Sequence, residues 1–260
     1  MGDGALVRVA AVVRQDLRLT LRDPTPFVVR TIMPLLIMAF MQPLFRSHLR
    51  DGGLADANGA EQAVPGMAVM SLFFLVNVIG FAMFREHGWN TWDRLRATAA
   101  RPAELLVARM VLPMVTAVLQ FAVVFVLGAL LLHLHVTGSY LALAVVGVAL
   151  ALDVVMVGMA LVAVCRTIAQ VSVLSNVLAL LFAGLGGALT PLSTLPGWAR
   201  PLAPAVPSYW AMRGFSEIIL RGGGLASVLL PTAMLCLFAV GLAVVILVFF
   251  RADHRKLSWS

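Results

Sequence analysis

The sequence predicts an all-α membrane protein with six transmembrane helices, and three observations lead to this fold class. The mean hydropathy is +0.98 over 260 residues, of which 61% are hydrophobic and only 12% are charged. Apolar stretches of about 18 residues or more recur along the chain, and each is long enough to cross a hydrocarbon core of roughly 30 Å. Because no water satisfies backbone groups in that core, each stretch is expected to be a helix.

The first element, residues 1–25, is predicted to be an amphipathic helix lying in the membrane interface. Basic residues recur four apart on one face, beside an apolar stripe, which is typical of interfacial helices. A solvated helix packed on a partner is the alternative. The sequence DPTP at 23–26 is expected to end the helix, because the residue before a proline disfavours the α region. The basic face holds Arg14, Arg18 and Arg22, and the stripe holds Leu6, Ala10, Val13, Leu17 and Leu21.

The remainder, residues 26–260, is predicted to be one six-span transmembrane domain. No internal repeat is evident, and no low-complexity linker divides it. Residues 46–64 are polar and glycine-rich, which favours an exposed outer loop with little order. The expected spans are 27–45, 65–84, 104–132, 140–164, 170–190 and 227–250.

The distribution of arginine and lysine predicts that both termini are cytoplasmic. With the N-terminus inside, 14 of the 19 basic residues fall in cytoplasmic segments and 5 fall outside, in agreement with the positive-inside rule. The arginines flank the spans and form no continuous basic face, so we expect no nucleic-acid partner. One lysine among abundant alanine, valine, leucine and arginine favours a GC-rich bacterial genome, and hence the bacterial cytoplasmic membrane.

The segment 191–226 is too apolar for a free loop and too rich in proline for a straight span. We therefore expect outer re-entrant helices at about 191–220. Trp198, Tyr209 and Trp210 are expected at headgroup depth, where aromatic rings favour the boundary.

A compact charged segment, REHGWNTWDRLRATAARP at 85–102, interrupts two long apolar runs. A short helix is predicted at about 86–101. Trp89 and Trp92 are three residues apart and share a face with Leu95, whereas Arg94 and Arg96 point elsewhere. An aromatic ridge flanked by charges has the features of an interface hot spot. An ordinary cytoplasmic loop with interfacial tryptophans is the alternative.

Polar residues inside the spans are the other candidates for function. Asp153 lies near the middle of the fourth span, where a carboxylate costs roughly 2.5–3.5 kcal/mol on insertion scales. It is expected either to line a substrate path or dimer face, or to be a protonated acid hydrogen-bonded to a neighbouring helix. Asn77, Gln120 and Asn176 are either interhelical hydrogen-bond partners or part of the same path or dimer face.

Two stretches resemble a known family. FREHGWNTWDRLRATAARPAELLVARMV (84–111) is similar to the segment after the second span of type-2 ABC exporter permeases, which include daunorubicin-resistance permeases. In that family a Glu-Arg-Glu-x-Gly run precedes a short coupling helix. Arg85, Glu86 and Gly88 match this run, and Phe84 replaces its first glutamate. LPGWARPLAPAVPSYWAMRGF (195–215) resembles the outer helices of the family.

The resemblance implies the permease subunit of an ATP-driven exporter that moves a hydrophobic or amphipathic compound, such as a drug, an antibiotic or a lipid-like molecule, out of the cell. When ATP closes a pair of ATPase subunits, the coupling helix seated on them moves and the spans open outward. The residues implied in ATPase coupling are Arg85, Glu86, Gly88, Trp89, Trp92, Asp93, Arg94, Leu95 and Arg96.

The implied partners follow from what the sequence lacks. A P-loop needs G-x-x-x-x-G-K-[ST], and Lys256 lies in RADHRKLSWS without that context, so the chain is not expected to be an enzyme. A separate nucleotide-binding ATPase, in two copies, would hold ATP and Mg, while this chain binds no cofactor and no metal. Six spans are half of the family's usual twelve, implying a homodimer or a homologous second permease. Membrane lipid is the remaining partner.

Two other functions stay open from the sequence. A proton-coupled secondary transporter would use Asp153 as its carrier group, but no inverted-repeat pair of broken spans is evident. An ABC exporter of lipid-linked polysaccharide is compatible with the same resemblance. A membrane enzyme is not favoured, because the sequence shows no Ser–His or H-E-x-x-H constellation.

Overall fold

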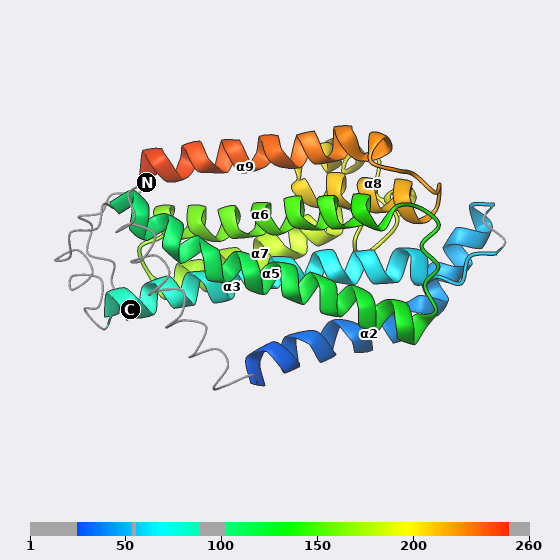
Figure 1. Ribbon diagram of the computed structural model, residues 1–260, viewed down its shortest axis with the longest axis horizontal. Helices are drawn as coiled ribbons and strands as arrows, with labels where there is room; N and C mark the ends of the chain where they lie inside the picture. Colours follow the sequence, from blue (N-terminus) through cyan, green and yellow to red (C-terminus); the bar gives the residue numbers. More distant parts are fainter. Residues whose placement is uncertain (1–24, 54–55, 89–101, 250–260) are drawn as a thin grey trace.

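A computed structural model describes residues 25–53, 56–88 and 102–249, which form an elongated bundle of helices (Figure 1). All regular elements of this part of the chain are helical. The α-helices are α2 (Thr25–Asp51), α3 (Ala60–Gly88), α5 (Pro102–Leu132), α6 (Tyr140–Val164), α7 (Ile168–Leu185), α8 (Pro207–Ile219) and α9 (Leu229–Phe249), and the 3-10 helices are η1 (Leu192–Thr194), η2 (Arg200–Ala205) and η3 (Ala226–Val228).

Six helices are long and apolar enough to cross a membrane, which confirms the predicted fold class. These candidate spans are Val28–Asp51, Ala60–Phe81, Arg109–Leu132, Tyr140–Val164, Ile168–Leu185 and Ala226–Phe249. The amphipathic helix expected at 1–25 lies outside the described residues, except for Thr25, where α2 begins.

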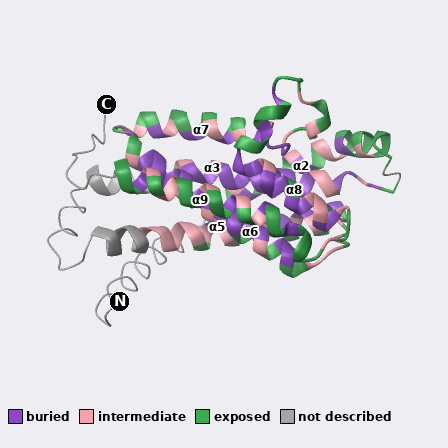
Figure 2. Ribbon diagram, turned by 90° about the horizontal axis from the view of Figure 1, so that it is seen from above, coloured by how far each residue is buried: buried purple, intermediate pink, exposed green. Residues whose placement is uncertain are grey.

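Two central helices carry most of the core. The candidate spans in α3 and α6 are 72% and 78% buried, against 22% in α2 and α7 and 17% in α9. Figure 2 shows this as buried residues concentrated along the middle of the bundle. Close packing depends on small residues, because a Cβ on Gly158 of α6 would lie only 2.9 Å from Cγ2 of Ile79 on α3.

The outer loop differs from the prediction. We expected little order at 46–64, but α2 continues to Asp51 and α3 starts at Ala60. The polar residues mark where the chain leaves the membrane, and arginine and leucine still favour a helix there. At the start of α3, Gly59 has φ +93° and lies against the α2 backbone, so that a Cβ would overlap the Gln42 carbonyl oxygen.

One asparagine joins three outer elements. The Asn58 amide nitrogen donates to the carbonyls of Leu132 (3.3 Å) and His133 (3.0 Å), where α5 ends, while its side-chain oxygen accepts from Ala60 N at 2.7 Å. Gln42 of α2 donates to the Asn58 carbonyl at 3.3 Å. Asn58 thus satisfies helix-end groups of both α3 and α5, and Gln42 adds a second donor to the Leu132 carbonyl at 3.5 Å.

Candidate functional site

One end of the bundle brackets the charged segment, the end that the arginine distribution predicts to be cytoplasmic. α3 ends at Gly88 and α5 begins at Pro102, and both ends lie at the same end of the bundle (Figure 1). Arg85, Glu86 and Gly88 therefore form the last turn of α3, continuous with the second span. The other predicted coupling residues, Trp89, Trp92, Asp93, Arg94, Leu95 and Arg96, lie outside the described residues, and their role stays a prediction.

A polar contact joins α3 to α7 inside the membrane region. The Asn77 amide nitrogen donates to Ser172 Oγ at 3.3 Å. The two helices are close here because Gly80, one turn further along α3, has no side chain and Val171 fills the space. A polar pair held between close-packed helices is the usual form of an interhelical hydrogen bond in lipid.

The same polar surface continues onto an exposed face of α7. Asn176 follows Ser172 at i+4, so the two side chains share a face, and Asn176 is exposed. It is the ninth residue of an 18-residue span, with the exposed apolar residues Val173 and Val177 beside it. Lipid tails cannot hydrogen-bond an amide, so Asn176 needs a polar partner or water at that depth. We call Asn77, Ser172 and Asn176 the α3–α7 polar strip.

The other two predicted residues lie in the interior of the chain. Gln120 of α5 and Asp153 of α6 are both 0% exposed. The Gln120 amide nitrogen donates to the Ser71 carbonyl of α3 at 3.4 Å. Neither its oxygen nor either carboxylate oxygen of Asp153 has a hydrogen-bond partner in the described part of the chain.

This burial separates the candidates into two groups. Asn77 is hydrogen-bonded to Ser172 and Asn176 lies one turn further along α7, whereas Gln120 and Asp153 lie among the helices of this chain. Asp153 is therefore covered by the helices of this chain, and its place on a substrate path or dimer face stays a prediction. Sequence spacing could not make this distinction, because α6 is apolar on all sides and gives no amphipathic pattern to orient Asp153.

The outer segment folds back into the bundle. After α7, Gln62 of α3 donates to the Gly187 carbonyl at 2.7 Å, and the Ser208 hydroxyl donates to the Phe182 carbonyl. α8 then runs back outward, where the Thr137 hydroxyl donates to the Ile219 carbonyl at 2.7 Å. The chain between α7 and α9 thus enters the bundle at the end opposite the charged segment and returns.

The aromatic residues of this segment are not equivalent. Trp198 is 71% exposed, as expected for a ring at the interface. Trp210 is instead buried, with Nε1 donating to the Pro204 carbonyl at 3.0 Å and the Arg213 guanidinium 5.6 Å from its ring. The polar N–H of Trp210 therefore finds its partner inside the protein, and the headgroup depth expected for Trp198, Tyr209 and Trp210 stays a prediction.

Within the described ranges no group of three or more His, Cys, Asp or Glu residues could hold a metal ion. In a comparison with known families, the family model described as "ABC-2 type transporter" matches residues 7–220. A comparison with curated proteins found no match. The matched range covers the charged segment, the polar strip and α8.

Proposed function

The chain belongs to the ABC-2 type transporter family, and we propose that it is the permease of an ATP-driven exporter that moves a hydrophobic or amphipathic compound out of the cell. A drug, an antibiotic or a lipid-like molecule fits this description. Membership of the family already makes the chain a multi-pass membrane permease of an ABC transporter. What we propose beyond family membership is the class of cargo, the outward direction of transport and the assembly with a second permease copy and an ATPase.

The α3–α7 polar strip carries the proposal. Asn176 presents an amide on an exposed, otherwise apolar face in the middle of a span. Such a group is costly in lipid unless it faces protein or water. A second permease copy packed near this face would cover the apolar residues and leave the amides lining a narrow path. A mostly apolar path with a few polar groups suits amphipathic cargo.

Two features of α3 support coupling to a separate motor. The helix is continuous from Ala60 to Gly88, so it carries Asn77 of the polar strip and, at its cytoplasmic end, Arg85, Glu86 and Gly88. A shift of that end would displace Asn77 with it, because a continuous helix moves nearly as a unit. The force would come from two copies of an ATPase subunit, which bind ATP and Mg and contact residues 86–101.

Purification of the chain from its native bacterial cytoplasmic membrane tests this proposal. In gentle detergent, we expect mass spectrometry to find a P-loop ATPase at about one copy per permease. In proteoliposomes, the correct cargo should stimulate ATP hydrolysis by the assembly. Recovery of the chain alone in several detergents, together with proton-driven transport by the isolated chain, would refute the proposal and redirect attention to Asp153.

A further inference from the structure

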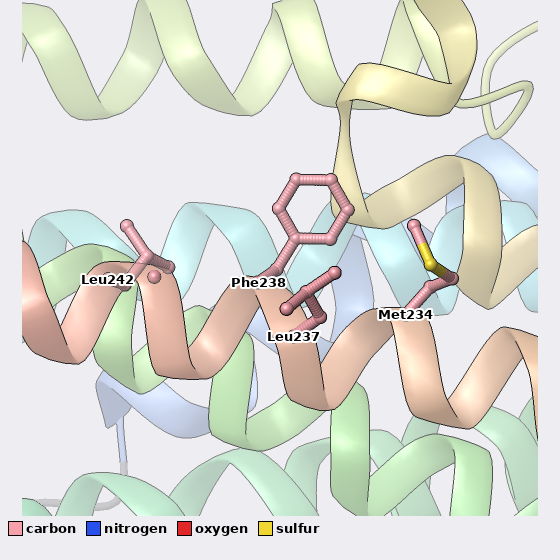
Figure 3. Close-up of a pocket in the computed structure, with 5 residues that line it drawn as sticks. Met234, Leu237, Phe238 and Leu242 are labelled. Carbon is pink, nitrogen blue, oxygen red and sulfur yellow. The ribbon is translucent and has the colours of Figure 1, made fainter.

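The last helix, α9, carries a hollow that the proposed export path does not use. Its candidate span is the least covered of the six, with 17% of its residues buried. The hollow has a volume of about 230 Å³ and is lined by five hydrophobic or glycine residues on one face of the helix (Figure 3). Gly241 creates part of this space, since nothing lies within 4 Å of where its Cβ would be. The lining residues are Met234, Leu237, Phe238, Gly241 and Leu242.

The outer end of the hollow lies next to α8. In Figure 3, Met234, Phe238 and Leu242 project from the same side of α9, and the ribbon of α8 passes close to Met234. A Cβ on Gly214 of α8 would lie 3.4 Å from Pro231, one turn before Met234. The two helices are therefore in contact at the level where the hollow begins.

α8 places an arginine at that level. Phe215 points toward α5, where its ring stacks on Phe121 at 5.6 Å. Since successive residues of a helix are about 100° apart, Arg213 points to nearly the opposite side. It is exposed, its guanidinium lies 5.6 Å from the Trp210 ring, and it has no ion pair within the part of the chain that the structure describes.

The hollow extends along α9 from the level of Gly214 and Arg213 toward the other end of the bundle. Met234 and Leu242 follow Pro231 by three and eleven residues, so the hollow extends from about 5 to 16 Å below the Gly214 level at a rise of 1.5 Å per residue. The larger of these two distances is about half of the ~30 Å thickness of the hydrocarbon core. The described acidic residues offer Arg213 no counter-charge, since Glu217, one turn further along α8, pairs with Arg221 at 2.6 Å.

We propose that Arg213 and the α9 hollow together bind one phospholipid of the outer leaflet. The phosphate accepts hydrogen bonds from the guanidinium, whose planar shape suits bidentate phosphate binding, and one acyl chain lies along Met234, Phe238 and Leu242. The volume of the hollow favours a single acyl chain as its occupant, since pockets for compact drug-sized ligands are usually about 300–1,000 Å³. The site depends on neither the export direction nor the motor.

Native mass spectrometry of the full chain, titrated with phosphatidylglycerol in mild detergent, tests the site. Arg213→Gln should weaken binding about tenfold or more, because a charge-assisted hydrogen bond is lost. The affinity of Arg213→Lys should lie between those of the wild type and Arg213→Gln, since lysine keeps the charge but cannot form the two parallel hydrogen bonds of a guanidinium. Gly241→Leu should weaken binding by filling the hollow.

Two matched variants serve as controls. Arg200→Gln removes another exposed outer arginine, one that donates to the Leu195 and Ser193 carbonyls, and Gly184→Leu adds the same side chain at an open position of α7. Both should bind like the wild type. Equal affinity in Arg213→Gln and wild type overturns the headgroup assignment. Equal affinity in Gly241→Leu, or full competition by glycerol phosphate, overturns the acyl-chain assignment.

Discussion

Val171 on α7 occupies the space that a side chain on Gly80 of α3 would need, since a Cβ on Gly80 would overlap Val171 Cγ1. The hydrogen bond between Asn77 and Ser172 lies one turn away. The two interactions form a single contact, with packing on one side and a hydrogen bond on the other. Because α3 continues to Gly88, beside the charged segment, this contact links α7 to the helix that ends there.

Gly80→Ala should therefore destabilise the bundle by about 1–3 kcal/mol, because a β-branched neighbour cannot turn away from the added methyl group. Val171→Ala in the same chain should restore most of the loss. Thermal unfolding in detergent measures both effects. Gly184→Ala is the control, since its Cβ would meet nothing within 4 Å. Equal unfolding temperatures for Gly80→Ala and wild type would contradict the close approach.

Asn58→Ala should lower the free energy of unfolding by about 1–3 kcal/mol, because it removes partners from helix-end groups of α3 and α5. Ser47→Ala provides the comparison, since Ser47 makes only a local bond to the Leu44 carbonyl on the surface of α2. Denaturant titration of the purified chain gives both values. A smaller loss for Asn58→Ala than for Ser47→Ala would show that the three outer elements do not depend on this asparagine.

The spans could be predicted because the length of each apolar run matches the thickness of the hydrocarbon core. The fourth span, expected at 140–164, matches α6 (Tyr140–Val164). Predicted ends fail where a helix continues beyond the lipid, as α2 does to Asp51, since polarity marks the membrane boundary and not the helix end. The fifth helix is shorter than expected and ends at Leu185, because Gly186 packs against Ser208 of α8 and the chain turns there. That tertiary contact has no local sequence signal.

The candidate site was only partly predictable for a related reason. Polar residues in a span are easy to find, but the side they face depends on which neighbours cover the helix. Asn176 and Asp153 were both candidates for a substrate path or dimer face, yet one is exposed and the other is buried. Arg213 is only one of the outer basic residues in the sequence, because its contact with the Trp210 ring depends on how α8 folds.

Asp153→Asn should fold with a stability within about 1 kcal/mol of the wild type, because the change is nearly isosteric and neither oxygen loses a hydrogen bond to the described residues. Gln120→Leu should lower the stability more than Asp153→Asn does, since it removes the hydrogen bond to the Ser71 carbonyl that joins α5 to α3. Thermal unfolding compares the two variants. A large loss in Asp153→Asn would indicate a bound water or ion that requires the carboxylate.

Asn176→Leu should leave the fold intact, because the side chain is exposed and the new one suits its apolar surroundings. Cargo-stimulated ATP hydrolysis should nevertheless fall several-fold, since the path loses a polar group that orients amphipathic cargo. Val177→Leu, on the next position of the same helix, should retain stimulation. Equal stimulation in both variants would remove Asn176 from the path.

Replacing Trp89 and Trp92 together by alanine should abolish co-purification of the ATPase subunit without unfolding the permease. The two rings share a face of the predicted coupling helix, and buried aromatic anchors carry a large part of the binding energy at interfaces, often 2 kcal/mol or more each by rough measure. Trp198→Ala removes an exposed tryptophan at the opposite end of the bundle and should keep the ATPase bound. Loss of the ATPase in both variants would indicate a general defect in the bundle. Retention in both would mean that the motor binds elsewhere, and that the charged segment between α3 and α5 only marks the cytoplasmic side of the membrane.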